Sequence, residues 1–239
     1  MSNVDDRINR FLADLDSAWP GGYTAVLFGS AARGEFIPGW SDINVLLILD
    51  RVTPELLRAA NGALSRWREH AEALPLLFGR EEWRRSADAY PLEIAEMREG
   101  YRVLRGADPL SGMTVRPADL RAALEREFRG KLMRLRQGYA LFRPPSDELA
   151  EFIRSSASSV LLLCRGLLLL TGEPVPAGAE AVVAAAAKQA GFAPEAVTRI
   201  VAHRHEAAWR ATENDVVEYL TAVETAARFV DHFHIGART

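Results

Sequence analysis

Two short stretches, Phe28-Gly-Ser-Ala-Ala-Arg-Gly34 and Ser41-Asp-Ile-Asn44, decide the fold of this 239-residue chain. The first ends the β-prone, mostly apolar segment 23–28, and the second leads into another apolar segment, 43–49. Both segments have the length and composition of buried strands. The sequence therefore predicts a strand, a glycine-serine turn into a short helix, and a second strand with an acidic residue at its entrance.

Further elements are expected on both sides of this pair of strands. Apolar residues recur at helical spacing near the N-terminus, and Thr53-Pro54 combines an N-cap with a proline in the first helical turn. Pro75 would be tolerated only in an edge strand. The expected elements are a helix over 4–15, a helix from Pro54 to about Glu72, an edge strand over 74–78, and strands over 90–97 and 101–104.

The second half of the chain carries no strand signals from Arg116 onward. Long helical patterns follow, interrupted by Pro144-Pro145 and by two glycine- and proline-containing segments, 172–176 and 191–194. We therefore expect an α+β chain with two domains: a mixed sheet with helices over residues 1–112 and an all-α helical bundle over residues 113–239. The predicted bundle helices span 117–142, 146–170, 177–190, 194–209 and 213–233.

The composition of the chain indicates where the protein is located and which classes of partner it binds. The net charge of −3 and the pI near 6.0 give no global basic field, which argues against nucleic acid as a partner. The single cysteine, Cys164, excludes an intramolecular disulfide and a cysteine-based metal site. The apolar segment 160–170 is shorter than the ~20 residues that cross a bilayer. With no signal-peptide pattern at the N-terminus, we expect a cytoplasmic protein without a membrane partner.

The two decisive stretches contain residue types that suit phosphate chemistry. Phosphoryl and nucleotidyl transfer depend on positioning and charge neutralisation, so a site needs amides for the phosphates and oxygen ligands for Mg²⁺. Gly29 allows close backbone approach to a polyphosphate, and the helix starting at Ser30 directs positive partial charge at the anion. The two-residue period of a strand places Asp42 and Asn44 on one face, where both can reach one metal ion.

These stretches resemble the signature of the polymerase-β-type nucleotidyltransferases, in particular the small bacterial minimal and kanamycin-nucleotidyltransferase-like proteins. In that family the glycine-serine pair holds the β- and γ-phosphates. Two acidic residues, separated by one residue of any type, bind two Mg²⁺ ions. A third carboxylate comes from a later strand. The resemblance implies Mg²⁺ or Mn²⁺ as the cofactor and ATP or another nucleoside triphosphate as a substrate.

The family roles transfer to individual positions of this chain with one departure. The family pattern expects aspartate or glutamate where Asn44 stands, and a neutral amide supplies one oxygen and no charge. Glu96 is an alternative third carboxylate, since strand alternation puts it on the other face from the first choice. The expected nucleotide-binding residues are Gly29, Ser30, Arg33 and Ser41, and the expected catalytic and metal-binding residues are Asp42, Asn44 and Glu93.

Two functional hypotheses follow from the resemblance and its departure. The first is an enzyme that transfers a nucleoside monophosphate, AMP from ATP, to a hydroxyl of an unidentified small molecule or protein. The second is a catalytically weakened or inactive nucleotide-binding or regulatory module, because Asn44 replaces a metal-binding carboxylate. The sequence leaves the oligomeric state open, with a homodimer as one alternative.

Several of these residues also have a purely structural interpretation. Gly29-Ser30 could be an ordinary strand-to-helix turn with a serine N-cap, Glu93 a solvated residue on a half-buried strand, and Arg33 a surface arginine at a helix end. On the long helix over 117–142, basic and tyrosine side chains either form a solvated face or line a cleft between the domains. Those helix residues are Lys131, Arg134, Arg136 and Tyr139.

Overall fold

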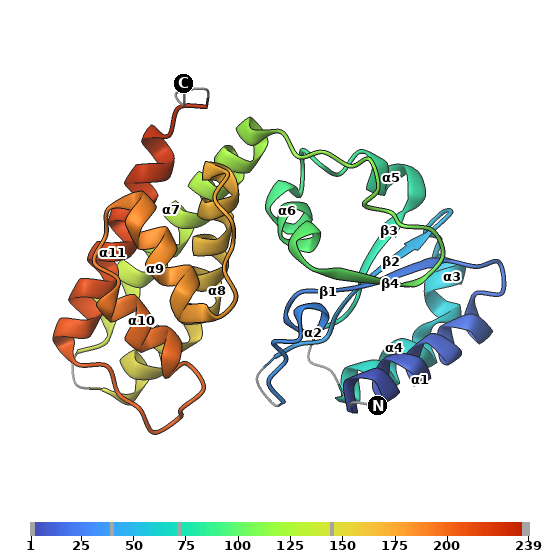
Figure 1. Ribbon diagram of the computed structural model, residues 1–239. Helices are drawn as coiled ribbons and strands as arrows, with labels where there is room; N and C mark the ends of the chain where they lie inside the picture. The colour runs from blue at the N-terminus through green and yellow to red at the C-terminus, as the bar shows by residue number, and fades with distance from the viewer. Residues whose placement is uncertain (1–2, 39–40, 71–72, 144–145, 236–239) are drawn as a thin grey trace. The chain divides into compact units, whose positions relative to one another are not determined.

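The computed structural model describes residues 3–38, 41–70, 73–143 and 146–235. The chain divides into two compact units, Met1–Thr114 and Val115–Thr239. The first unit combines a four-stranded sheet with helices, and the second consists of helices in its described part (Figure 1). The α+β architecture expected from the sequence is confirmed.

The sheet of the N-terminal unit is mixed, with strand order β3-β2-β1-β4. Its central strand β1 pairs antiparallel with both β2 and β4, whereas β2 pairs parallel with β3. The predicted edge strand is therefore confirmed as β3, and Pro75 precedes its first paired residue. The strands are β1 (Thr24–Phe28), β2 (Asn44–Leu49), β3 (Leu76–Gly79) and β4 (Tyr101–Arg105).

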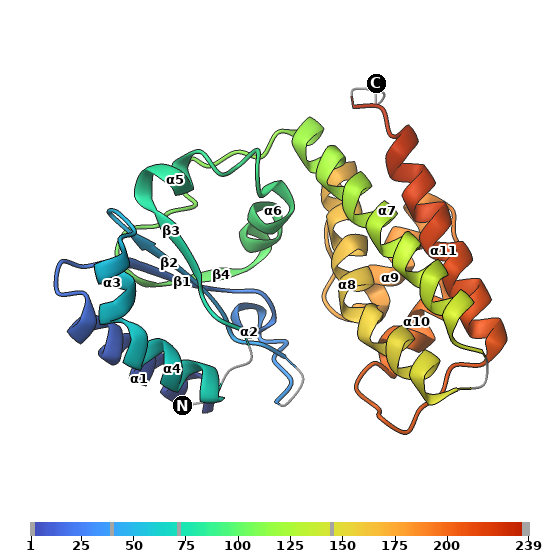
Figure 2. The ribbon, with the colours of Figure 1, turned by 180° about the vertical axis from the view of Figure 1, so that it is seen from behind.

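One face of this sheet packs on three helices: α1 (Asn3–Ala18), α3 (Pro54–Ala59) and α4 (Asn61–His70) (Figures 1 and 2). Alternate residues of the central strands enter this core because side chains of a strand alternate between its faces. The buried positions facing α1 and α4 include Ala25, Leu27, Val45, Leu47 and Leu49.

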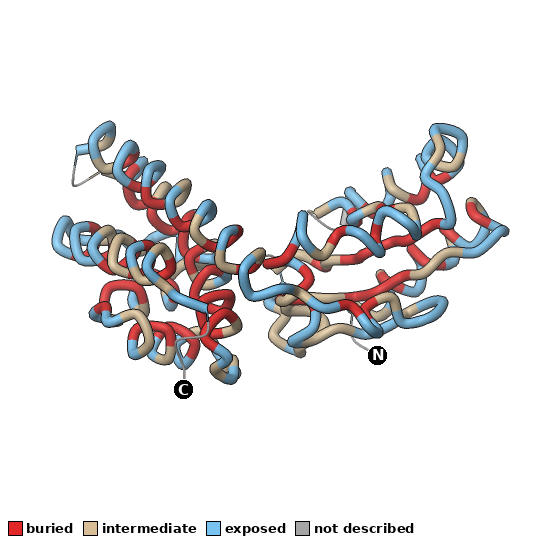
Figure 3. Tube along the Cα trace, turned by 90° about the horizontal axis from the view of Figure 1, so that it is seen from above, coloured by how far each residue is buried: buried red, intermediate tan, exposed pale blue. Residues whose placement is uncertain are grey.

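The opposite face lies toward α5 (Arg80–Arg84) and α6 (Pro91–Glu99) (Figures 1 and 2). The intervening strand residues Val26, Leu46 and Ile48 are buried on this side. Figure 3 shows how buried residues run along the strands and along the inward sides of the helices. By the same alternation, Asn44 belongs to the face that carries α5 and α6.

Two predicted elements of the N-terminal unit are wrong in detail. The helix expected from Pro54 onward is divided at Ala60 into α3 and α4, and its expected end at Glu72 lies outside the described residues. The segment 90–97 is not a strand but helix α6. Its apolar positions fit a period of two and a helical period equally over so short a run, and Pro91 in the first helical turn favours the helix.

The C-terminal unit is a bundle of five helices in its described part. Helices α7, α8 and α11 are the long ones; α7 packs on α8 and α11, and α9 and α10 pack on one another and on α8 and α11 (Figure 2). The predicted break at Pro144-Pro145 lies outside the described residues. The helices are α7 (Pro117–Leu141), α8 (Asp147–Thr171), α9 (Ala179–Ala190), α10 (Glu195–Ala202) and α11 (Glu213–His232).

Helix α8 is the apolar centre of this bundle. It is long and apolar enough to cross a membrane by length and composition, yet 67% of its most apolar window is buried within the structure. Inside it, Ser156 Oγ and Tyr219 Oη of α11 share a hydrogen bond of 3.0 Å, which satisfies two buried hydroxyls. Burial also raises the pKa of the Cys164 thiol to about 12. The predicted bundle helix over 146–170 is therefore confirmed, and most of its apolar window is buried.

Candidate functional site

The glycine-serine turn lies at the end of β1. Gly29 has φ 75° and ψ −153°, a conformation that L side chains rarely adopt, and α2 (Ser30–Arg33) starts directly after it. Gly34 then ends this one-turn helix in the left-handed conformation, with its N–H bonded to the Ser30 carbonyl. The amides of Ala32 and Arg33 both donate to the Gly29 carbonyl at 3.1 Å, so the donors that the turn leaves for a ligand are the amides of Ser30 and Ala31.

The side chain of Asn44 stands beside this turn. Phe28 and Asn44 are paired in the antiparallel β1–β2 register, so Gly29 and Asn44 lie at the same end of the two strands. A Cβ built on Gly29 would lie 3.0 Å from Asn44 Nδ2. The structure therefore brings together the turn and the position where the family pattern expects the second acidic residue.

Asp42 precedes β2 by two residues and is half-buried. Its Oδ1 is a buried oxygen that accepts no hydrogen bond from the described residues. A buried carboxylate oxygen without a partner is costly, so this atom is suited to a cation or to a donor supplied by a ligand. Asp42 and Ser30 belong to the same end of the β1–β2 pair.

Ser41 has a local structural task. Its hydroxyl accepts a hydrogen bond from the Ile37 amide at 3.1 Å, and its own amide donates to the Ile37 carbonyl at 2.8 Å. These two bonds close the loop that leads into Asp42. The expected role of Ser41 at the nucleotide stays a prediction, and the structure shows a residue that fixes the loop.

Arg33 is engaged by two carboxylates. Its Nε lies 3.0 Å from Glu35 Oε2, and its Nη1 lies 3.8 Å from Glu96 Oε2 on α6. The side chains of Arg33 and Glu96 are 17% and 10% exposed, so this pair is largely shielded from water. Arg33 is therefore not an isolated surface arginine, but its Nη1 is buried and makes no hydrogen bond to the described residues. Its expected role at the nucleotide stays a prediction. Arg33 ties α2 to α6.

The two candidates for a third carboxylate differ in position. Glu93 is in the first turn of α6 and exposed, whereas Glu96 is buried and paired with Arg33. The strand on which Glu93 was expected does not exist, because α6 occupies those residues. A role for Glu93 at a metal ion remains a prediction without a strand to direct it.

The donor set suits one magnesium ion better than two. Among the described residues, no group of three His, Cys, Asp or Glu side chains is arranged to hold a metal ion. Strand β3, parallel to β2, contributes only Leu76, Leu77, Phe78 and Gly79. Mg²⁺ is often held by one or two carboxylates together with substrate phosphates, and Asp42 with its unpartnered oxygen fits that mode. A two-metal centre needs more negative charge than Asp42 and Asn44 provide.

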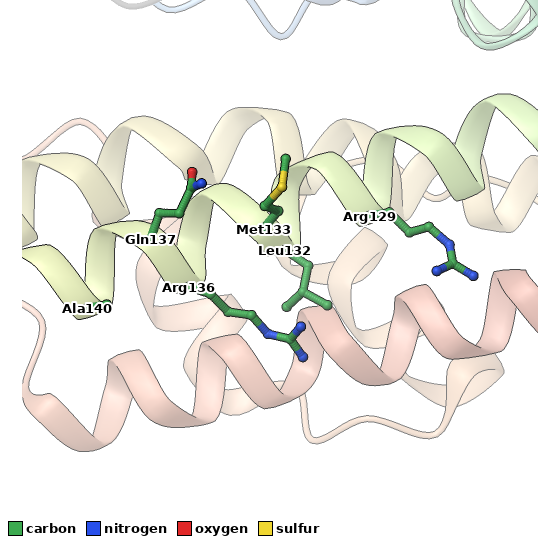
Figure 4. Close-up of a pocket in the computed structure, with 6 residues that line it drawn as sticks. All are labelled: Arg129, Leu132, Met133, Arg136, Gln137 and Ala140. Carbon is green, nitrogen blue, oxygen red and sulfur yellow. The ribbon is translucent and has the colours of Figure 1, made fainter.

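Two of the four α7 residues that the sequence singled out, Arg136 and Tyr139, bond to residues of α11. Arg136 pairs with Glu224 at 3.1 Å, and Tyr139 donates to Glu213 at 3.2 Å. Burial, followed by the charge of Arg134, lowers the pKa of Lys131. A pocket of about 440 Å³ is lined by residues of this helix. In Figure 4, Met133 and Gln137 lie on one side of α7 and Arg136 on the other. These contacts favour the solvated-face interpretation for Arg136 and Tyr139.

Sequence reasoning missed Gly100, which supports the arrangement around Arg33. A Cβ on Gly100 would lie 2.5 Å from Arg33 Cγ, so only glycine leaves room for the arginine stem between α2 and the start of β4. The one signal for it was its position directly before the predicted strand at Tyr101. Such a close approach depends on residues 67 positions apart and has no local pattern.

Residues 8–97 match the family model of a nucleotidyltransferase domain. The matched range extends from α1 to α6 and includes the Gly29 turn, Asp42 and Asn44. This agrees with the resemblance to the polymerase-β-type nucleotidyltransferases. No curated protein matches the chain closely enough to be named as a relative. The chain therefore contains a nucleotidyltransferase domain, followed by a helical unit.

Proposed function

We propose that the nucleotidyltransferase domain of residues 8–97 binds ATP or another nucleoside triphosphate and slowly transfers its nucleoside monophosphate to a hydroxyl of a small molecule or protein. One observation carries the proposal: the unpartnered carboxylate oxygen of Asp42 and the Gly29 turn belong to the same end of β1 and β2. A polyphosphate and its divalent ion need such a combination of amide donors and an anionic oxygen.

The residues have distinct roles in this proposal. Gly29 lets the phosphates approach the backbone, and the first amides of α2 donate to them. Asp42 would hold one Mg²⁺ or Mn²⁺, with the Asn44 amide as a neutral neighbour that either coordinates or donates to a phosphate oxygen. The ion, when bound, neutralises phosphate charge. Arg33 holds α2 against α6 and thereby positions the turn.

The proposal is tested by pyrophosphate release from Mg²⁺-ATP, with water and a panel of hydroxyl compounds as acceptors. The wild-type chain should exceed Asp42→Ala in rate, since the variant lacks the only carboxylate that the proposal places at the ion. Asn44→Asp should raise the rate by about tenfold or more, because a second carboxylate holds and orients the ion better. Equal rates for all three proteins would contradict transfer activity.

A second candidate is a nucleotide-binding module that has lost the reaction. The neutral Asn44 and the absence of any acidic residue from β3 favour it. Isothermal calorimetry with ATP and Mg²⁺ distinguishes the two candidates. Binding that Asp42→Ala weakens, together with no pyrophosphate release by the wild type or by Asn44→Asp, would identify the module. No binding and no release would exclude both.

A further inference from the structure

A cavity of about 330 Å³ lies between α1 and α4, on the sheet face opposite the one to which Asn44 belongs. Its apolar wall contains Phe11 and Trp67, whose rings stack with centroids 4.3 Å apart and an interplanar angle of 29°. Phe11 and Trp67 are each only 3% exposed, so most of both side chains is packed in the core and only a small part of each borders the cavity. None of the residues expected at the nucleotide lines this cavity.

The rim of the cavity carries three arginines and one aspartate. Arg66 and Asp14 form an ion pair at 3.0 Å and neutralise one another. Arg10 Nε donates to the backbone carbonyl of Asp6 at 3.3 Å, which leaves its charge uncompensated by that bond. The rim therefore has an excess of positive charge above an apolar wall.

Arg7 provides the sharpest indication of a ligand. Its Nε is buried and makes no hydrogen bond to any described residue. A buried donor without an acceptor is unfavourable, and a guanidinium matches the geometry of a carboxylate or a phosphate. The cavity has the size of a small-molecule pocket, which typically combines apolar walls with a few polar groups that fix orientation.

We infer that this cavity binds a small molecule with an oxyanion, a carboxylate or a phosphate, attached to a flat apolar ring. The oxyanion accepts from Arg7, with Arg10 contributing charge, and the ring lies over the apolar lining, to which Ala13 and Ala63 contribute beside Phe11 and Trp67. The site is separate from the proposed nucleotide site, so it is an effector site or a second substrate site. Its occupancy does not depend on the proposed transfer reaction.

The probes are phenyl phosphate, benzoate and benzyl alcohol, which share a ring and differ in charge. The readout is the indole N–H signal of Trp67 in ¹⁵N spectra of the full chain, one of five tryptophans, assigned with Trp67→Phe. We expect both anions to shift this signal with a Kd on the order of 1 mM or below. Benzyl alcohol should bind about tenfold more weakly, because it lacks the charge-assisted bond. The tighter anion identifies phosphate or carboxylate as the preferred group.

Variants separate the site from general charge effects. Arg7→Ala should weaken anion binding by about tenfold. The affinity of Arg7→Lys should lie between those of Arg7→Ala and the wild type, because lysine keeps the charge but lacks the planar guanidinium with its paired N–H donors. Arg58→Ala on α3 removes an exposed arginine outside the cavity and should change nothing. The inference is overturned if neither anion shifts the Trp67 signal up to about 10 mM. Equal binding by folded Arg7→Ala and wild type, or equal binding of benzyl alcohol, overturns it as well.

Discussion

Gly29 lies directly against Asn44, since a Cβ on Gly29 would stand 3.0 Å from Asn44 Nδ2. Gly29→Ala adds that contact to the strain of a side chain at φ 75°. We expect the free energy of unfolding to fall by about 1–3 kcal/mol, and nucleotide affinity to fall with it. Urea unfolding and calorimetry with Mg²⁺-ATP measure the two effects.

The matched control is Gly34→Ala. Gly34 has a similar φ of 77°, but its added Cβ would meet no atom within 4 Å. The difference between the two variants reports the contact with Asn44 together with the greater backbone strain at Gly29, whose ψ is −153° against 16° for Gly34. If both variants lose the same stability, the turn does not press on Asn44 as the structure indicates.

The close approach of Gly100 to Arg33 predicts strong coupling between these residues. Gly100→Ala should destabilise the N-terminal unit by about 1–3 kcal/mol because its Cβ would lie 2.5 Å from Arg33 Cγ. In an Arg33→Ala background the same change should lower the free energy of unfolding by about 0.5 kcal/mol or less, since the aliphatic part of the Arg33 side chain no longer occupies that space. A double-mutant cycle by urea unfolding provides the measurement. Additive effects would contradict the contact.

Two glycines of α7 should respond in opposite directions to alanine. A Cβ on Gly138 would lie 2.2 Å from the Phe152 ring of α8, so Gly138→Ala should destabilise the bundle by about 1–3 kcal/mol. Gly130 has no atom within 4 Å of the same position, and Gly130→Ala should stabilise by about 0.5–1 kcal/mol through helix propensity. Thermal unfolding compares the two. A higher thermal midpoint in both variants would show that α7 and α8 are not in close contact at Gly138.

The capping box at the start of α11 predicts that the protein loses stability as the pH falls. Asp215 accepts from the Thr212 amide and hydroxyl at 2.9 and 2.8 Å and from Arg199 Nε at 2.8 Å. Burial acts to raise the pKa of Asp215, but these bonds and the Arg199 charge outweigh it, so the pKa is lowered. The stabilisation is therefore fully present above the unfolded-state pKa of about 3.9 and is lost as the pH falls through the lower folded-state pKa.

Asp215→Asn should accordingly lower the free energy of unfolding by about 1–2 kcal/mol at pH 7, and the difference from wild type should shrink at a pH below the unfolded-state pKa of about 3.9. Urea titrations at both pH values check this. Asp147→Asn, which removes an exposed partner of Arg210, serves as the control and should cost less than about 0.5 kcal/mol. A loss that does not vary with pH would rule out the carboxylate charge as its cause.

Much of the fold could be predicted because local patterns and packing agree. The segments before Gly29 and after Asp42 are strands, and the proline in 74–78 indicated an edge. Short segments were less certain, since the apolar residues of 90–97 satisfy two periods at once. Helix α10 likewise ends at Ala202 rather than at Trp209, and the ring of Trp209 stacks on His203 at 5.0 Å instead.

The candidate site was predictable only to the level of the backbone. The order of the motifs predicted a strand that ends at Gly29 and a second strand that contains Asn44. The structure pairs these strands antiparallel and brings Asn44 next to Gly29. Other features arise from packing between segments that are distant in the sequence. These are the pairing of Arg33 with Glu96, the space left by Gly100 and the cavity at Arg7. No local spacing rule encodes such contacts. The catalytic and metal-binding roles of Asp42, Asn44 and Glu93 stay predictions.

The amide of Asn44 also affects how the domain behaves without any divalent ion. Two carboxylates at neighbouring strand positions would repel one another, and a folded chain would then gain stability when a cation screens them. With one acid and one amide there is no such repulsion to relieve. The thermal midpoint of this protein should therefore fall less on addition of a chelator such as EDTA than the midpoint of Asn44→Asp does.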